Sequence, residues 1–343
     1  MAQVKQGSFR LWGQTGILSF QKQVELIDKA AKMEGLNSSI VPFEQNISPM
    51  KSVVDKQLVF VVAMPFIMLW VFRVSWQAYA KKSIAYMACE GTPLIDMHQK
   101  TLMSQVRVVG VSRWASERLR EVGCKVEGWV PHAWDPEEFK LGEEEAKDLR
   151  RQYAGKFLVG YVGSPIPRKG LNLLGEAAKI IWEKGNKDIL FLLHTQRWQD
   201  CIIPEGPNIV QRLNFGQFSH DKMVSFYKAL DLYVQPSLAE GFCIPLLEAM
   251  AAGKPIVSVA GGPMAELNGP DRGYLVPVKE LKKQDQGMGQ DFWLYYYSPV
   301  DLADAILQAY SNGQEREEKA AKALEFAQAY TYDKVYVPLI RRI

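Results

Sequence analysis

The sequence predicts an α/β protein with two doubly wound, parallel sheets. The chain has 343 residues, a length that suits two domains of ordinary size. In both halves, apolar runs of strand length alternate with segments of helical period, as they do when helices join parallel strands. The composition, 48% hydrophobic and 23% charged, is typical of a globular protein. We expect an N-terminal domain over residues 1–153 and a C-terminal domain over residues 154–327.

The first domain alternates strand and helix patterns. We expect strands at residues 8–12, 58–64, 83–87 and 106–111, and helices at 20–33, 113–122 and 142–151. Ser112 precedes one of these helices, where its hydroxyl can accept a hydrogen bond from an unpaired backbone N–H. The apolar run 58–72 is shorter than the roughly 20 residues that span a bilayer and contains Pro65. It therefore predicts a buried strand and then a helix that begins at Pro65, rather than a transmembrane helix.

The second domain begins with another apolar strand. We expect strands at residues 157–162, 190–194, 232–234 and 255–259, and helices at 223–229, 244–252 and 332–342. A turn with two glycines and two cations, residues 163–170, follows the first of these strands and leads into a helical period. This order of elements is the one expected for a parallel, doubly wound sheet.

Charge is unevenly distributed along the chain. Residues 1–125 hold 16 lysines and arginines against nine acidic residues, and the other residues hold 25 against 29. The basic first half suggests an anionic partner, and plain solubility explains the same balance equally well. The N-terminus shows no apolar signal segment, and the four cysteines show neither close pairing nor metal-ligand spacing. These features predict a cytoplasmic protein with reduced thiols, at the inner membrane surface if the basic half contacts anionic lipid.

The segment from Glu240 to Glu248 is the most informative part of the sequence. Pro245 suits the first turn of a helix, which places Glu248 about one turn inside that helix. Glu240 precedes the helix, in a loop. Backbone N–H groups at a helix N-terminus bind anions, and a carboxylate on either side can accept hydrogen bonds from hydroxyl groups. A ligand that carries both phosphate and hydroxyls, such as a nucleotide sugar, fits this arrangement.

The same segment resembles a known signature. Glu-x7-Glu followed by Ala-Met-Ala-Ala-Gly-x-Pro-Ile-Val looks like the motif of the retaining glycosyltransferases of family 4. The resemblance implies the GT-B fold, with two Rossmann-like domains that face each other across a cleft and a last helix, residues 328–343, that crosses back to the first domain. It also implies that Glu240 contacts donor sugar hydroxyls and that Glu248 contacts the ribose. The loop between them would lie close to the sugar and phosphate through Gly241, Phe242, Cys243 and Ile244, with Cys243 where glycine is usual.

The turn after the strand 157–162 resembles the diphosphate-binding Gly-Arg-x4-Lys-Gly element of the same family. Gly163, Lys169 and Gly170 match it, whereas Ser164 stands where the family has arginine. Arg168, next to the lysine, can supply the missing charge. An ordinary glycine-rich turn with exposed basic residues is the alternative explanation. The turn lacks the Gly-Lys-Ser/Thr of a P-loop and the Gly-x-Gly-x-x-Gly of dinucleotide-binding proteins.

Four further residues are weaker candidates. Gly13 and Gly16 bound a loop where the family's first domain approaches the donor or acceptor, and a simple turn explains them equally well. Glu90 follows a predicted strand and is a candidate catalytic residue at the cleft. His194 ends a strand near the expected nucleotide.

These patterns together predict a metal-independent glycosyltransferase that moves a hexose from a UDP- or GDP-sugar to an acceptor with retention. Glu240, Lys169 and Glu90 are the predicted catalytic residues. Because the sequence contains no Asp-x-Asp, we expect no metal, and cationic side chains would neutralise the leaving diphosphate. The acceptor would be a glycan, a lipid-linked molecule or a protein, with no role for nucleic acid. A sugar-nucleotide epimerase of the same fold and a non-catalytic nucleotide-sugar-binding subunit are the alternatives.

Overall fold

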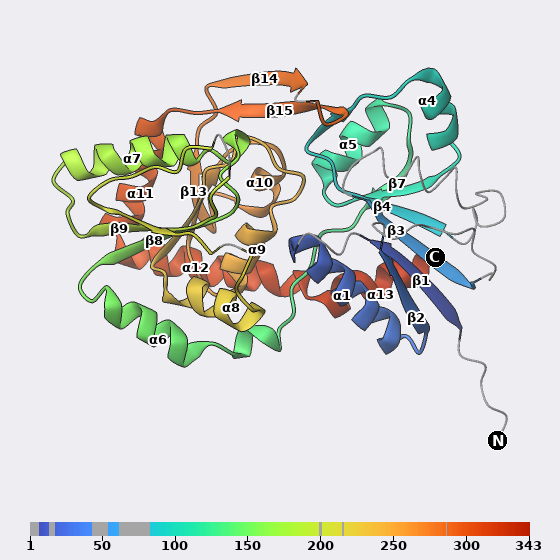
Figure 1. Cartoon of the computed structure of the whole chain (residues 1–343), viewed down its shortest axis with the longest axis horizontal. Helices are drawn as coiled ribbons and strands as arrows, with labels where there is room; N and C mark the ends of the chain where they lie inside the picture. The colour runs from blue at the N-terminus through green and yellow to red at the C-terminus, as the bar shows by residue number, and fades with distance from the viewer. Residues whose placement is uncertain are drawn as a thin grey trace. The chain divides into compact units, whose positions relative to one another are not determined.

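A computed structural model describes residues 7–13, 18–42, 54–61, 83–198, 201–214, 216–285 and 287–343 (Figure 1). The chain forms two compact units. Unit 1 comprises Met1–Trp134, Lys283–Phe292 and Tyr330–Ile343, and unit 2 comprises Asp135–Lys282 and Trp293–Ala329.

Unit 1 is built on a parallel sheet of six strands, in the order β2-β1-β3-β4-β6-β7. The strands are β1 (Ser8–Gly13), β2 (Asn37–Pro42), β3 (Lys56–Val61), β4 (Ser83–Met87), β6 (Arg107–Gly110) and β7 (Lys125–Trp129). Every residue of β4 is buried, as expected for a strand with neighbours on both sides and helices over the sheet. The predicted strand 58–64 is confirmed as β3 over residues 58–61, and residues 62–64 and the helix predicted from Pro65 lie outside the described residues.

The helices of unit 1 are α1 (Leu18–Met33), α4 (Met97–Met103), α5 (Arg113–Glu121) and α13 (Tyr332–Arg342). The predicted cap of α5 is confirmed, because Ser112 Oγ accepts a hydrogen bond from the Ala115 N–H at 3.0 Å. The final helix α13 packs against α1, the first helix of the described residues, within one unit. Among the described residues, no helix is long and apolar enough to cross a membrane.

Unit 2 is built on a second parallel sheet of six strands, in the order β10-β9-β8-β11-β12-β13. The strands are β8 (Phe157–Val162), β9 (Ile189–His194), β10 (Ile209–Arg212), β11 (Leu232–Gln235), β12 (Ile256–Val259) and β13 (Gly273–Val276). The chain runs outward from β8 in one direction, then returns to add β11 on its other side. The order of strands therefore reverses between β8 and β11, and such switch points are where open α/β sheets bind ligands.

Seven α-helices accompany the described part of this sheet (Figure 1). They are α6 (Glu143–Gln152), α7 (Leu171–Glu183), α8 (His220–Ala229), α9 (Ile244–Ala251), α10 (Gly262–Leu267), α11 (Pro299–Ser311) and α12 (Gly313–Ala327). Helix α11 packs against α7, and α6 packs against α8. Because of this second contact, α6 belongs to unit 2. The boundary after Trp134 therefore precedes the one that the sequence predicted after residue 153.

A small third sheet has no counterpart in the sequence-based prediction. It contains β14 (Glu280–Asp285), β15 (Gln290–Tyr296) and β5 (Gly91–Pro93), in the order β14-β15-β5. Strands β15 and β5 run antiparallel, with Asp291 opposite Thr92. A side chain at Gly91 would place its Cβ 1.9 Å from the carbonyl oxygen of Asp291, so only glycine fits this close approach.

Candidate active site

Two loops of unit 2 meet at the switch point of its sheet. One loop follows β8 and contains Lys169, and the other follows β11 and contains Glu240. Both loops leave the carboxyl ends of neighbouring strands, since β8 and β11 pair directly. The sequence order of the strands thus brings together two segments that are 71 residues apart.

Backbone contacts hold the two loops against each other. The Leu238 N–H donates to the Arg168 carbonyl oxygen at 2.7 Å. Gly170 has φ +69°, and a Cβ at this position would lie 2.0 Å from the Pro236 carbonyl oxygen. That same oxygen accepts a hydrogen bond from the Tyr297 hydroxyl at 2.7 Å. Only glycine combines this left-handed conformation with so close a contact, which explains why Gly170 follows the lysine.

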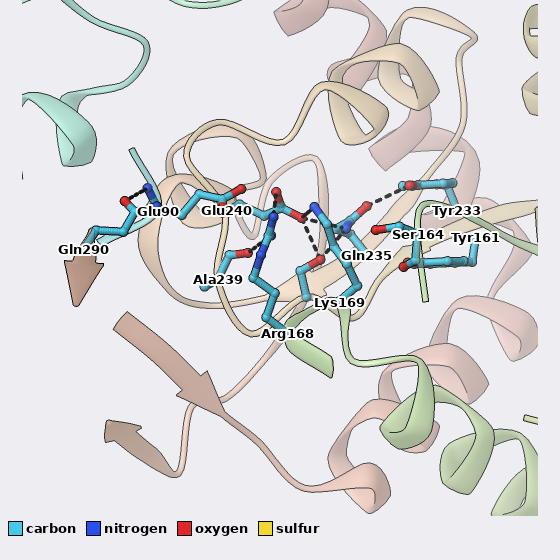
Figure 2. Close-up of polar contacts among 11 residues, drawn as sticks. Glu90, Tyr161, Ser164, Arg168, Lys169, Tyr233, Gln235, Ala239, Glu240 and Gln290 are labelled. Carbon is cyan, nitrogen blue, oxygen red and sulfur yellow. Dashed lines mark hydrogen bonds and ion pairs between the residues drawn. The ribbon is translucent and has the colours of Figure 1, made fainter. Parts of the chain in front are cut away.

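A buried ion pair lies between the loops. Lys169 Nζ lies 2.6 Å from Glu240 Oε1, and the side chains are 16% and 5% exposed (Figure 2). Arg168 Nη1 lies 4.0 Å from the other carboxylate oxygen, Glu240 Oε2, and donates to the Ala239 carbonyl oxygen at 3.1 Å. Two cations therefore flank one buried carboxylate, from consecutive positions of one loop.

Neutral donors complete the surroundings of Glu240. Ser237 Oγ donates to Glu240 Oε1 at 2.7 Å, and Gln235 Nε2 donates to the same oxygen at 3.3 Å. Burial alone would raise the pKa of Glu240, but the charges of Lys169 and Arg168 and the hydrogen bonds from Lys169 and Ser237 together lower it below its usual value. Glu240 is therefore ionised at neutral pH, and an ionised carboxylate accepts hydrogen bonds, as from sugar hydroxyls.

Helix α9 begins beside Glu240 with an unusual backbone conformation. Cys243 has φ 83° and is the only non-glycine residue with positive φ in the described part of the chain. The position thus has the conformation that glycine adopts most easily. Burial, and then the charge of Glu240, raises the pKa of the Cys243 thiol well above its usual value, which keeps the thiol protonated. Gly241, Phe242 and Ile244 are buried beside it.

The second glutamate of the segment lies inside α9, as predicted. Glu248 is half-buried, and its Oε2 accepts a hydrogen bond from the Tyr227 hydroxyl of α8 at 2.8 Å. Tyr227 itself is fully buried. The tyrosine therefore fixes one carboxylate oxygen of Glu248 from within the core.

The other predicted residues of unit 2 form hydrogen bonds at the start of the loop that follows β8. The Gly163 N–H donates to the His194 carbonyl oxygen at 3.1 Å, and the Ser164 carbonyl oxygen accepts from the Tyr161 hydroxyl at 3.0 Å. The His194 side chain has no exposed surface and stacks on Phe218, with ring centroids 4.4 Å apart. Burial, and next Arg212, lowers the pKa of His194 to about 4. His194 thus contributes its backbone to the loop, while its imidazole belongs to the core.

The remaining predicted residues belong to unit 1. The Glu90 N–H donates to Gln290 Oε1 at 3.1 Å, just before β5 (Figure 2). Gly13 ends β1, where a Cβ would lie 2.4 Å from the Val24 side chain, and Gly16 lies outside the described residues. Among the described residues, no group of three or more His, Cys, Asp or Glu side chains is placed to hold a metal ion.

Sequence reasoning missed the residues that orient the two glutamates. They are Tyr227, Tyr233, Gln235 and Ser237. A signal for some of them is present in the sequence, because β11 reads Leu-Tyr-Val-Gln, with polar atoms at alternate positions of an otherwise apolar, fully buried strand. Side chains two apart in a strand point to the same face, so Tyr233 and Gln235 can form a pair. Tyr227 carries no comparable signal, since its partner lies on another helix.

Comparison with known proteins identifies the family of this chain. The family of glycosyl transferases group 1 matches residues 143–325, which is more than half of the chain and includes both loops of the site. This chain belongs to the group 1 glycosyl transferases. An uncharacterized glycosyltransferase of Sulfolobus islandicus rod-shaped virus 1 is 26% identical over 267 residues, which cover 74% of this chain and 78% of that protein. A GDP-mannose-dependent alpha-mannosyltransferase of Corynebacterium glutamicum is 28% identical over 40% of this chain and 35% of its own length.

Solved structures of other glycosyl transferases share the fold. Sucrose-phosphate synthase from Thermosynechococcus elongatus superposes with a TM-score of 0.73 at 16% identity, over 98% of both chains. Anabaena HepE, in complex with UDP-glucose, superposes with a TM-score of 0.72 at 15% identity, again over 98% of both chains. The prediction of a GT-B fold with two Rossmann-like domains is therefore confirmed.

Proposed function

We infer that this group 1 glycosyl transferase is a retaining, family 4 type enzyme that moves a hexose from a nucleotide diphosphate sugar to an acceptor. One observation carries this proposal: Lys169 and Glu240 form a buried ion pair at the switch point of the unit 2 sheet, beside the beginnings of α7 and α9. A cation next to helix N-termini suits a diphosphate, and an ionised carboxylate suits sugar hydroxyls.

In the proposed reaction, the bond between the anomeric carbon and the diphosphate oxygen breaks, and negative charge grows on the departing oxygen. Lys169 and Arg168 lie on the loop that precedes α7 and neutralise this charge. Each contact strengthens as the charge develops, so it stabilises the transition state more than the ground state. Glu240 orients the sugar and Glu248 the ribose. The acceptor oxygen attacks the face from which the diphosphate leaves, and a phosphate oxygen takes its proton.

The nucleobase and the sugar of the donor are the first features to determine. One relative is GDP-mannose-dependent and one structural neighbour holds UDP-glucose, so both kinds of donor are reasonable candidates. We would measure thermal unfolding with UDP, GDP, ADP and NAD at millimolar concentration. A ligand at about 100 times its dissociation constant stabilises the folded state by about 2.7 kcal/mol, which is visible as a shift in Tm. A shift with one nucleoside diphosphate that disappears in Lys169→Ala supports the donor site, and a shift with NAD alone contradicts it.

Turnover assays separate the proposal from its alternatives. An epimerase would convert the nucleotide sugar without any acceptor, and a binding subunit would bind it without turnover. The serine at position 164 is the feature that keeps the binding subunit under consideration. For the proposed enzyme, we expect transfer that depends on acceptor, persists in EDTA and gives a product with the anomeric configuration of the donor. Loss of activity in EDTA or inversion at the anomeric carbon would contradict the proposed mechanism.

Unit 1 would bind the acceptor, which we propose to be a glycan, a lipid-linked molecule or a protein. Its part of the sequence carries the excess of lysine and arginine, which suits an acceptor at an anionic membrane surface on the cytoplasmic side. Sedimentation with vesicles that contain or lack anionic lipid tests the membrane contact. Binding that does not depend on anionic lipid would remove this part of the proposal.

A further inference from the structure

A chain of buried hydrogen bonds leads from the core of unit 2 to Glu240. The Tyr233 hydroxyl donates to Gln235 Oε1 at 2.7 Å, and Gln235 Nε2 donates to Ser237 Oγ at 2.6 Å. Ser237 Oγ then donates to Glu240 Oε1 at 2.7 Å. Tyr233, Gln235 and Ser237 are each at most 1% exposed. We call these three residues the relay; Figure 2 shows two of them, Tyr233 and Gln235, beside Glu240.

The carboxylate sets the direction of every hydrogen bond in the relay. An ionised Glu240 can only accept, so Ser237 and the Gln235 amide must both present donors to it. The amide nitrogen of Gln235 therefore faces Glu240, and its oxygen faces Tyr233. The hydroxyl of Tyr233 must then donate, and burial together with the charge of nearby groups raises its pKa well above its usual value. The hydrogen bonds of the relay therefore all run, donor to acceptor, from Tyr233 toward Glu240. Exchanging donor and acceptor at any one of its residues would lose a hydrogen bond.

The relay also distinguishes the two oxygens of Glu240. Oε1 accepts from Lys169, Ser237 and Gln235, which exceeds the two lone pairs of one oxygen. Oε2 lies on the side of Arg168, at 4.0 Å from Nη1, which is beyond hydrogen-bond distance. A hydroxyl of a bound sugar would therefore meet Oε2 rather than Oε1.

We propose that Gln235 and Ser237 are positioning residues of the transfer reaction, whose hydrogen bonds to Oε1 of Glu240 turn its Oε2 toward the sugar of the donor. This inference rests on the proposed function. The burial of three polar side chains supports a role beyond packing. Hydrogen-bonded polar groups in a core stabilise a fold no better than apolar residues of the same shape would. Val234, on the same strand, shows that an apolar side chain fills a fully buried position there.

The test compares two buried serines, Ser237 in the loop that follows β11 and Ser258 on the neighbouring strand β12. Ser237→Ala removes a donor to Glu240, whereas Ser258→Ala removes a buried partner of Asn268, 2.9 Å away, and leaves the relay intact. With the nucleoside diphosphate that stabilises the wild type, and with its glucose or mannose conjugate, we expect Ser237→Ala to lower kcat/KM for the donor by roughly 10- to 100-fold, the effect of one hydrogen bond to a charged group. Affinity for the diphosphate without sugar should stay within about twofold. Ser237→Thr, which keeps the hydroxyl, should restore most of the activity.

A pH profile gives a readout that a structural role would not move. Gln235→Glu places a second carboxylate next to Glu240, and like charges raise the pKa of the pair. The acid limb of the kcat/KM profile should therefore move to higher pH, whereas Ser258→Ala should leave it in place.

Each negative outcome identifies what fails. If Ser237→Ala and Ser258→Ala lower kcat/KM and Tm in parallel, the relay is structural and the inference is wrong. If both relay variants, Ser237→Ala and Gln235→Glu, keep wild-type kinetics while Glu240→Gln is impaired, the relay has no part in positioning and the proposed function stands. If Glu240→Gln itself keeps wild-type kinetics, the site assigned under the proposed function fails, and the inference fails with it.

Discussion

Each unit contains a buried polar network that includes tyrosine hydroxyls, and the two networks differ in charge. In unit 1, the Tyr86 and Tyr336 hydroxyls lie 3.0 and 3.5 Å from His132 Nδ1. Tyr336 also donates to Gln23, which exchanges two hydrogen bonds of 3.0 Å with the backbone of Ala133. In unit 2, the relay from Tyr233 ends on Glu240 and its two cations.

The difference separates a network whose partners are all structural from the network that we propose to serve the transfer reaction. The unit 1 network is neutral, since burial lowers the pKa of His132 to about 3, and its hydrogen bonds end on backbone atoms of the same unit. The unit 2 network ends on charged groups that are 12% and 16% exposed, which retain some access to solvent or ligand. Burying ionised groups costs desolvation free energy, and such groups are concentrated at functional sites such as ligand-binding sites. Four predictions follow from this comparison, and the largest expected effect comes first.

Lys169→Ala should nearly abolish activity. It removes the cation at the proposed leaving group, and the loss of such an electrostatic contact lowers kcat/KM by about 100-fold or more. Steady-state kinetics with the donor measure the effect. Lys184→Ala is the matched control, because Lys184 pairs at 2.8 Å with Asp304 on the exposed surface of the same unit. Equal kinetics in the two variants would show that unit 2 holds no charged catalytic site at Lys169.

Acid should destabilise the protein through His132. The folded state binds a proton at this buried imidazole only near pH 3, whereas the unfolded chain binds it near the usual pKa of 6.5. Below pH 6.5 the unfolded state therefore takes up a proton that the folded state does not, so stability falls as pH falls, by up to about 1.4 kcal/mol per pH unit until the pH approaches 3. Urea unfolding at several pH values measures the slope.

The slope should be shallower in His132→Asn, which lacks the buried imidazole. Some slope should remain in His132→Asn, because His194 in unit 2 also has a lowered pKa, of about 4. An identical slope in wild type and His132→Asn would mean that the unit 1 network does not hold a neutral imidazole.

Tyr336→Phe should reduce stability without changing donor binding. The variant removes the hydroxyl that links α13 to Gln23 of α1 in the core, and a lost buried hydrogen bond costs about 1 to 3 kcal/mol. Arg341→Ala is the control, because it removes an ion pair at the surface between α13 and Glu34, the residue that follows α1. Exposed pairs of this kind often contribute nothing measurable. A change in the donor KM of Tyr336→Phe would contradict the purely structural role of this network.

Cys243 gives the smallest expected effect and tests strain beside the site. At φ 83°, a Cβ is unfavourable by about 1 to 2 kcal/mol, whereas glycine avoids this cost. Cys243→Gly should therefore be more stable than Cys243→Ala by about 1 kcal/mol, the reverse of the usual order in a helical segment. The control is Ala321→Gly, at an exposed position within α12, which should lower stability. If alanine is the better residue at both positions, the backbone at Cys243 is not strained in solution.

Much of the fold was predictable because it depends on local patterns. Strand β8 and helix α13 have the predicted bounds, 157–162 and 332–342, since their apolar periods and flanking polar residues are clear. The third sheet was missed because β5 and β14 are short or fully exposed and show no apolar alternation. The predicted boundary after residue 153 differs from the division after Trp134, because the charged segment 142–151 reads in sequence as an exposed helix between the domains. Its two buried residues, Ala146 and Leu149, lie on a helix that packs against α8.

The sequence by itself determined the two parallel sheets, the family and the residue types of the site, because strand periods, glycine turns and the spacing of Glu240 and Glu248 are local properties. Only the tertiary structure decided that Lys169 pairs with Glu240, that Gln235 and Ser237 orient the carboxylate, and that His194 lies in the core. These contacts join segments from different strands, and the order of strands in the sheet decides which loops meet. That order depends on how whole helices and strands pack, a property that no short stretch of sequence contains.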